Sequence, residues 1–181
     1  MHPLLEKLRG GDSRSMGLVN EVARQVLRAP ALLGELFRGM LSSDPIIRMR
    51  AADAAQKVTA ERPELLQRYK KRLLYEIASI DQQEVRWHVA QMIPRLELTP
   101  QERALAVKIL ITYLALKSKI VRTFALQALA SLAANDPALR RKVLAIVRDV
   151  AKNGSPAMQA RGRKLLAQLR GVVGTGPPQG K

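Results

Sequence analysis

The fold is decided by a ten-residue stretch whose clearest copy reads Ile120-Val121-Arg122-Thr123-Phe124-Ala125-Leu126-Gln127-Ala128-Leu129. Two earlier copies read Glu84-Val85-Arg86-Trp87-His88-Val89-Ala90-Gln91-Met92-Ile93 and Ile46-Ile47-Arg48-Met49-Arg50-Ala51-Ala52-Asp53-Ala54-Ala55. Each copy has a β-branched residue, then an arginine, then small apolar residues three and four places further on. The three arginines lie 38 and 36 residues apart, and a weaker copy at Met158-Gln159 places Gln159 37 residues after the last of them. So steady a period predicts a solenoid of stacked helical units.

Prolines mark the expected helix starts with unusual regularity. Proline is favoured at the first helical position, and Asp, Ser or Thr just before it caps the helix. The chain repeats this signal at Asp44-Pro45, Thr99-Pro100, Asp136-Pro137 and Ser155-Pro156, and Thr99 with Glu102 also forms a capping-box pattern. From these starts and the apolar periodicity, we expect helices at 15–27, 31–41, 45–59, 63–79, 82–93, 100–116, 118–133, 137–152 and 156–169.

The predicted fold class is therefore all-α, an α-α superhelix of about four helix pairs with one leading N-terminal helix. Residues 15–170 form the solenoid. Residues 1–14 are expected to be loosely ordered, with a short docking turn open to Leu4, Leu5 and Leu8, and the Gly- and Pro-rich residues 171–181 are expected to be a flexible tail. Because no helix pair could bury both of its faces alone, stacking of the pairs is what creates a continuous core.

Composition excludes several kinds of site. The chain has no cysteine, so disulfides, thiolate metal sites and cysteine nucleophiles are absent. Its two histidines, His2 and His88, make a histidine-based zinc site improbable. No run of 18 apolar residues occurs, so no transmembrane helix is predicted. We expect a cytoplasmic protein without a metal, a cofactor or a membrane association.

Charge is the strongest functional signal in the sequence. The formal net charge is +16. Residues 121–181 hold 11 Lys and Arg against two Asp and Glu, a net charge of +9, whereas the first 120 residues carry a net charge of +7. An excess of this size points to an acidic partner, either nucleic acid or an acidic protein surface.

The repeated stretch resembles the HEAT-repeat family of armadillo-like α-solenoids. The resemblance rests on Asp44-Pro45-Ile46-Ile47-Arg48-x-x-Ala51-Ala52, on Glu84-Val85-Arg86-x-x-Val89-Ala90 and on Val121-Arg122-x-x-Ala125, and it covers roughly residues 30–170. It implies an interaction scaffold that binds protein or nucleic acid on an extended surface, with the second helix of each pair lining the concave face. The chain departs from the family where it places Lys117-Ser118 instead of an Asp before the third arginine and Gln159 instead of the fourth arginine.

Three groups of residues are candidates for binding. The first group is a basic edge at the starts of the second helices, where free N–H groups and the helix dipole already attract anions: Arg48, Arg86, Lys119 and Arg122. These arginines could instead bond across repeats and hold the array together. The second group is a C-terminal basic set for which carboxylate partners are scarce: Arg140, Arg141, Arg161, Arg163 and Lys164, within a wider set that includes Lys142, Arg148, Lys152 and Arg170. It could equally be a capping repeat kept soluble by its charge.

The third group lies on the expected concave face and comprises Trp87, Gln91 and Gln127. Counted at 100° per residue from Ile47, Val85, Val121 and Met158, the residues six places on point away from the buried side: Asp53, Gln91, Gln127 and Lys164. The two glutamines could hydrogen-bond a peptide or a base edge, or could be solvated surface residues. Trp87 could stack on a base, or pack between repeats.

The predicted function is non-catalytic binding of an acidic macromolecule, with the nucleic-acid phosphate backbone ahead of an acidic protein surface. A protein–protein adaptor that uses the concave face is the alternative. A further alternative is a HEAT-like DNA glycosylase acting on alkylated bases, which needs a carboxylate near an aromatic-lined pocket. The candidate carboxylates for Trp87 are Asp81, Asp53 and Glu84, and none has a persuasive spacing from it. No enzyme activity is expected.

Overall fold

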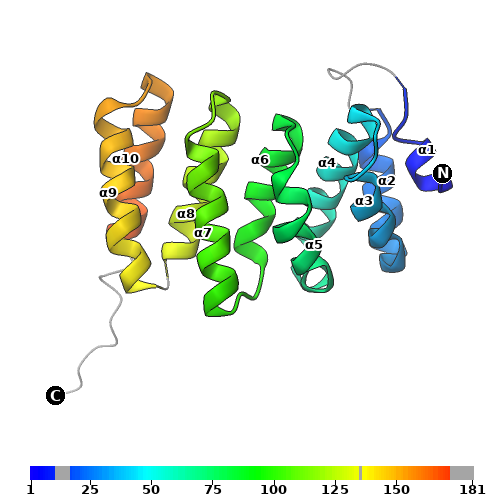
Figure 1. Cartoon of the computed structure of the whole chain (residues 1–181), viewed down its shortest axis with the longest axis horizontal. Helices are drawn as coiled ribbons and strands as arrows, with labels where there is room; N and C mark the ends of the chain where they lie inside the picture. The colour runs from blue at the N-terminus through cyan, green and yellow to red at the C-terminus, as the bar shows by residue number, and fades with distance from the viewer. Residues whose placement is uncertain (11–16, 135, 172–181) are drawn as a thin grey trace.

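The computed structural model describes residues 1–10, 17–134 and 136–171, and these residues form helices and turns without any β-strand. Helix pairs follow one another along the long axis of the molecule, from α1 beside the N-terminus to α9 and α10 at the other end (Figure 1). The predicted all-α superhelical arrangement is confirmed. The helices are α1 Pro3–Glu6, α2 Val19–Arg28, η1 Pro30–Leu32, α3 Leu33–Gly39, α4 Pro45–Glu61, η2 Pro63–Tyr69, α5 Lys70–Tyr75, η3 Ile77–Ser79, α6 Gln83–Met92, η4 Ile93–Arg95, α7 Pro100–Leu114, α8 Lys119–Ala133, α9 Pro137–Asn153 and α10 Pro156–Gly171.

Two rows of helices build the superhelix. The second helices α4, α6, α8 and α10 pack side by side in one row, and the leading helix α2 extends this row by packing on α4. The first helices α3, α5, α7 and α9 form the other row, each preceding its partner in the chain. Alanines make the row of second helices close-packed, because Ala51, Ala52, Ala54 and Ala55 of α4 are all fully buried.

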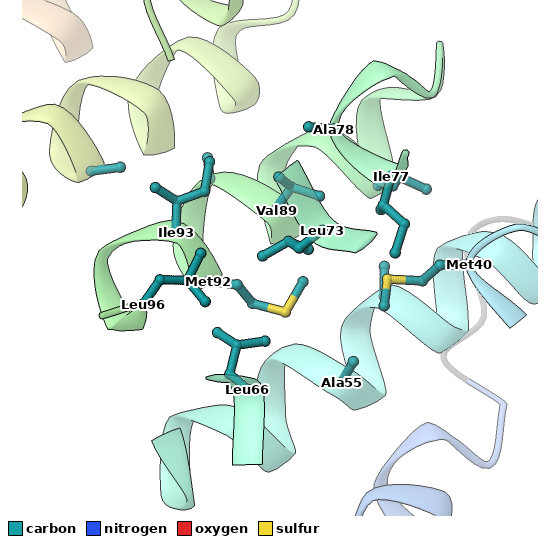
Figure 2. Close-up of a cluster of buried hydrophobic side chains, with 14 of the residues drawn as sticks. Met40, Ala55, Leu66, Leu73, Ile77, Ala78, Val89, Met92, Ile93 and Leu96 are labelled. Carbon is teal, nitrogen blue, oxygen red and sulfur yellow. The ribbon is translucent and has the colours of Figure 1, made fainter. Parts of the chain in front are cut away.

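A single core runs through successive pairs. Figure 2 shows Met40 and Ala55 of the first pair meeting Leu73 and Met92 of the second. Leu66, on η2, closes the same cluster and is fully buried. Because residues of neighbouring pairs fill one apolar space, removing a pair would expose the face of the next.

The helix starts with a capping residue follow the sequence prediction closely, whereas the leading helix begins at Val19 and not at residue 15. The Asp44 carboxylate accepts a hydrogen bond from the Ile46 amide at 2.8 Å, and the Asp136 carboxylate accepts one from the Leu139 amide at 2.9 Å. Thr99 and Glu102 make both bonds of the predicted capping box. These local caps fix where α4, α7 and α9 begin.

The first helix of the second pair differs from the prediction. Residues 63–79 were expected to form one α-helix, but they form η2, the short α5 and η3. A 3₁₀ helix has three residues per turn, so Pro63, Leu66 and Tyr69 of η2 lie along one side. That side is held by tertiary contacts: Leu66 is fully buried, and the Tyr69 ring stacks on Phe37 with 4.3 Å between the ring centroids.

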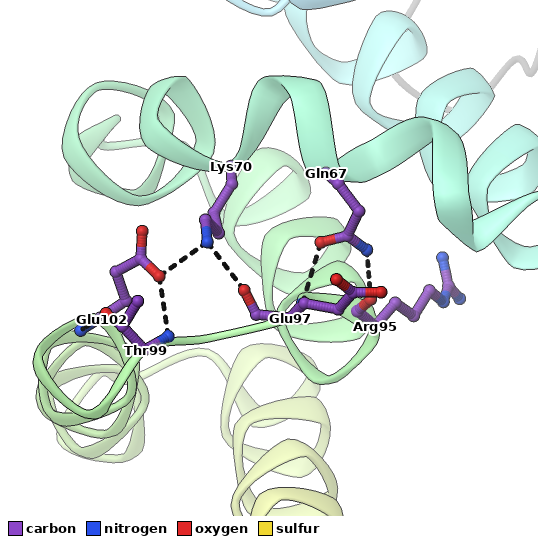
Figure 3. A network of polar contacts seen from close by, with 6 residues as sticks. All are labelled: Gln67, Lys70, Arg95, Glu97, Thr99 and Glu102. Atoms are coloured by element: carbon purple, nitrogen blue, oxygen red, sulfur yellow. Dashed lines mark hydrogen bonds and ion pairs between the residues drawn. The ribbon is translucent and has the colours of Figure 1, made fainter.

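Polar contacts join the turn after α6 to η2 and α5, which belong to the first helix of the second pair (Figure 3). Gln67 donates to the Arg95 carbonyl at 2.9 Å and accepts from the Glu97 amide at 2.9 Å. Lys70 donates to the Glu97 carbonyl at 2.8 Å and pairs with the Glu102 carboxylate at 2.7 Å. The contacts fix the third pair relative to the second.

The N-terminal residues form a reduced extra pair. The one-turn helix α1 packs on α3 while α2 packs on α4, so the two occupy the positions of a first and a second helix. Leu4, Leu5 and Leu8 are buried, and this is the docking turn that the sequence left open. The Arg50 guanidinium fastens it by donating to the carbonyls of Leu8 at 3.0 Å and Gly10 at 2.6 Å. Gly171, expected to begin the flexible tail, is instead the last residue of α10. Residues 11–14 and 172–181 lie outside the described part of the chain.

Candidate functional site

Two arginines of the repeated stretch join neighbouring pairs. Arg48 donates through Nε to the Gln82 side chain at 2.7 Å and through Nη1 to the Ser42 carbonyl at 2.8 Å. Gln82 returns a hydrogen bond to the Pro45 carbonyl at 2.9 Å. Because Gln82 precedes α6 while Arg48 and Pro45 belong to α4, the exchange ties the first pair to the second.

Arg86 makes the corresponding link to the third pair. Its guanidinium pairs with the Asp81 carboxylate at 2.8 Å and lies 6.0 Å from the ring centre of Tyr113 on α7. The Tyr113 hydroxyl donates to the Ala78 carbonyl at 2.7 Å. Burial raises the pKa of Tyr113 and the nearby Arg86 lowers it less, so the phenol keeps its proton and remains a donor.

The other two residues of the basic edge differ in exposure. Arg122 is half-buried, and its buried Nε has no hydrogen-bond partner among the described residues. Lys119, the first residue of α8, is exposed. Of the four predicted edge residues, only Lys119 therefore presents its charge fully to solvent.

Members of the C-terminal basic set have different surroundings. Arg140 donates through Nε to the Ala133 carbonyl at 3.3 Å and through Nη2 to the Ala134 carbonyl, so it caps the end of α8. Arg161 donates to the Gln127 side-chain oxygen at 3.2 Å and links α10 to α8. The remaining three predicted residues are exposed: Arg141, Arg163 and Lys164.

Ion pairing divides the molecule into two parts. Within the described residues, every ion pair joins partners between Glu6 and Glu102. The stretch 103–171 has 14 Lys and Arg but only two carboxylates, Asp136 and Asp149. Asp136 caps α9, and Asp149 accepts a hydrogen bond from Asn153 at 2.7 Å. The cations of α7 to α10 are therefore not neutralised by carboxylates of the described chain.

Four exposed arginines of α9 and α10 share a seven-residue spacing, which distinguishes them from the rest of the predicted C-terminal basic set. Arg141 and Arg148 are both exposed on α9 and lie seven residues apart, which places them on the same side of that helix. Arg163 and Arg170 repeat this spacing on α10 and are also exposed. We call these four residues the terminal arginines. The seven-residue spacing is visible in the sequence, but the exposure of each residue is not.

The row of second helices is hollowed beside the two predicted glutamines. A cavity of about 260 Å³ lies between α6 and α8, with Gln91, Gln127 and Phe124 in its lining. A second cavity of about 530 Å³ lies between α8 and α10 and shares Gln127 and Ser131 with the first. Gln91 accepts a hydrogen bond from Gln56 of α4 at 3.3 Å. The two adjoining cavities form one groove, and Gln91 and Gln127 both lie in its lining.

Two other concave-face predictions need correction or refinement. Asp53 was expected to point away from the buried side, but it is only 9% exposed and its carboxylate pairs with Lys57 at 3.1 Å. Asp53 lies on α4, against which both α2 and α6 pack. Its partner Lys57 donates to Asn20 of α2 at 2.9 Å, and the charge of Asp53 acts on His88 of α6. Trp87 is half-buried against the core and lies edge-on to His88, with 5.5 Å between the ring centroids.

Within the described part of the chain, the residues that line the two cavities of the groove include Phe124 and Arg95, but no Asp or Glu. Among the described residues, no group of three or more His, Asp or Glu side chains could hold a metal ion. No helix in the described ranges is long and apolar enough to cross a membrane.

Comparison of the chain with protein-family models and with curated proteins finds no match.

Proposed function

We propose that the protein is a non-catalytic, cytoplasmic HEAT-like scaffold that binds the phosphate backbone of nucleic acid through the C-terminal part of its solenoid. The observation that carries the proposal is the lack of ion pairing after Glu102 in the described chain, where 14 cations accompany two carboxylates already engaged in uncharged contacts. Unneutralised cations on rigid helices repel one another, and a polyanion relieves that repulsion. Arginine suits phosphate because its planar guanidinium donates two parallel hydrogen bonds.

The framework residues set the geometry in this proposal. Arg48, Arg86 and Arg140 are engaged in contacts within the solenoid. They hold the helices in place, while exposed cations such as Arg141, Arg163 and Lys164 contact the ligand. Such contacts position a backbone without reading base sequence.

Binding to nucleic acid at low salt tests the proposal. The measurement is fluorescence anisotropy with a labelled mixture of fragmented DNA and RNA at several salt concentrations. We expect a linear fall of log affinity with log salt, because each neutralised phosphate releases counterions.

Charge reversal locates the binding surface. Arg163→Glu with Lys164→Glu is expected to weaken binding strongly. The matched control is Arg68→Glu with Lys71→Glu, which reverses two exposed cations outside the C-terminal part. Absence of binding by the folded wild type at low salt contradicts the proposal.

A protein–protein adaptor is the second candidate function, and the groove beside Gln91 and Gln127 favours it. Capture of partners from a native lysate, with and without nuclease, separates the two candidates. Nuclease removes a partner held through nucleic acid. A polypeptide retained after nuclease treatment, and lost when Gln127 is replaced by Arg, supports the adaptor.

A further inference from the structure

The last helix pair ends the solenoid with arginines. On α10, Arg161 contacts α8 through Gln127, and Arg163 lies about 200° further round the helix, so it points away from α8. Arg163 also lies one turn after Gln159, which donates to the Lys152 carbonyl of α9 at 3.0 Å. The row of Arg163 and Arg170 therefore flanks the contact between α9 and α10 on the side that no preceding pair covers.

The row on α9 flanks the same contact. Arg148 lies one turn before Ala151, whose backbone would be about 3.0 Å from a Cβ atom at Gly162 of α10. Arg141 lies seven residues before Arg148, and it shares the lining of a hollow of about 550 Å³ with Leu144 at the start of α9. The two rows thus border one helix–helix contact.

Helix geometry sets the size of this array. Seven residues advance an α-helix by about 10.5 Å, and packed helices lie about 8–10 Å apart. The terminal arginines therefore stand near the corners of a square about 10 Å on a side. This length falls between the widths of the two grooves of a double helix, about 6 Å for the minor and about 12 Å for the major groove of B-DNA. Four charges so placed can contact both backbones at once.

Base stacking is not available at this surface. No Phe, Trp or Tyr follows Phe124 in the sequence. Proteins that bind single strands rely on aromatic side chains as stacking platforms for successive bases. A single strand would here gain phosphate contacts alone, and it would first have to be ordered to match rigidly held charges. A duplex already holds its two backbones at a fixed separation.

We infer that the terminal arginines Arg141, Arg148, Arg163 and Arg170 form a docking face for double-stranded nucleic acid, which they contact through the phosphates of both strands. The inference rests on the proposed function and narrows its ligand to the duplex form. Two like-charged faces repel, so two copies of this chain do not associate face to face through this surface.

The test compares a labelled duplex with the single strand of the same length, by anisotropy over a salt series, with the full chain. We expect the duplex to bind more tightly at equal phosphate concentration. Arg148→Gln with Arg163→Gln should lower the slope of log affinity against log salt by about 2 for the duplex, one for each lost phosphate contact. The matched control Arg24→Gln with Arg68→Gln, which removes two exposed arginines elsewhere, should leave the slope unchanged. Circular dichroism confirms that each variant is folded.

The outcomes separate this inference from the proposed function. Equal or tighter binding of the single strand overturns the duplex face and leaves nucleic-acid binding standing. If the control variant loses as much of the slope of log affinity against log salt as Arg148→Gln with Arg163→Gln does, the binding face is not at the terminal arginines. Polyglutamate is the competitor that tests the spacing of the charges. If it displaces the labelled duplex as well as unlabelled duplex does at equal charge concentration, the surface recognises net charge alone. That result overturns the inference that the spacing of the terminal arginines matches a duplex. No binding of either nucleic acid at low salt overturns both proposals.

Discussion

At the scale of single residues, His88 makes the stability of the protein depend on pH. His88 is only 9% exposed where α6 packs on α4, and no residue in the described ranges forms a hydrogen bond with its buried Nδ1. Burial lowers the pKa of His88 from 6.5 to about 4, and Asp53 offsets this only partly. Between those values the unfolded chain binds a proton that the folded chain excludes, so stability falls as the pH falls.

We expect a loss of about 2 kcal/mol from this residue between pH 7 and pH 5. Urea unfolding at both pH values, for the wild type and for His88→Gln, measures it. The variant keeps a polar side chain that does not titrate. Between pH 7 and pH 5, its free energy of unfolding should therefore fall by about 2 kcal/mol less than that of the wild type. Carboxylate titration is common to both proteins and cancels in the comparison. An equal loss in the two proteins contradicts the prediction.

Gly162 shows how closely the last two helices approach. A Cβ atom at this position would lie 2.9 Å from the backbone nitrogen of Ala151 and 3.0 Å from its Cα. Backbone atoms of a packed helix cannot yield as a side-chain end can. Gly162→Ala should therefore destabilise the fold by about 1–2 kcal/mol, because the overpacking cost exceeds the gain in helix propensity.

Gly171 supplies the control for that substitution. It also lies on α10, but apart from its own helix turn no atom of the described residues lies within 4 Å of where its Cβ would be. Gly171→Ala should leave the free energy of unfolding unchanged or slightly raise it. The two variants are compared by chemical denaturation. A stable Gly162→Ala protein would show that α9 and α10 separate easily.

At the scale of elements, the network around Lys70 fixes how the third pair follows the second (Figure 3). The Lys70 amine contacts the Glu102 carboxylate at 2.7 Å and the Glu97 carbonyl at 2.8 Å. The hydrogen bond from Lys70 is the largest cause of a lowered pKa at Glu102, followed by the Thr99 amide. Lys70→Met keeps the aliphatic stem and removes both contacts.

We expect Lys70→Met to lower the free energy of unfolding by about 1 kcal/mol through the lost hydrogen bond to the Glu97 carbonyl. The loss of the ion pair should also raise the pKa of Glu102 in an NMR titration. The neighbouring residue gives a matched control, because Lys71 is exposed and Lys71→Met should change neither quantity. If the Glu102 pKa stays the same in Lys70→Met, the ion pair does not persist in solution.

Local and distant contacts explain which elements could be predicted. Asp44, Thr99 and Asp136 each cap the helix that follows them, so short-range sequence was enough to place α4, α7 and α9. The break of residues 63–79 into η2, α5 and η3 depends on contacts such as Tyr69 with Phe37 and Gln67 with Arg95. Those partners are distant in sequence, and helix periodicity carries no information about them.

The same distinction applies to the candidate site. Sequence identified the cations, but it could not distinguish Arg140, which caps α8, from its exposed neighbour Arg141. It also assigned Asp53 to the open face, because it could not show that α2 and α6 would both pack against α4. Exposure of a charged side chain depends on which helices become neighbours, and that is settled only by the packing of the whole array.

At the scale of the whole molecule, charge is distributed very unevenly. The first 102 residues contain 16 Lys and Arg and 13 Asp and Glu, whereas the remaining residues contain 15 and two. Repulsion within the second part opposes folding, and dissolved salt screens it. The first part has no comparable repulsion, because its charges are nearly balanced and many are paired.

Salt should therefore stabilise this protein. Raising the salt from about 0.01 M to about 1 M shortens the Debye length from about 30 Å to about 3 Å. If screening contributes about 1 kcal/mol, the melting temperature of a domain of this size rises by about 2–4 °C.

Arg141→Gln with Arg163→Gln should melt at a higher temperature than the wild type at low salt, and its melting temperature should change less when salt is added. Arg24→Gln with Arg68→Gln removes the same charge from the balanced part and should retain the wild-type response. The measurement is the melting temperature of each variant at low and high salt, followed by circular dichroism. Equal changes in the two variants would show that repulsion is spread over the whole chain. In that case the C-terminal cations do not repel one another more than the rest, and a polyanion would relieve no local repulsion there.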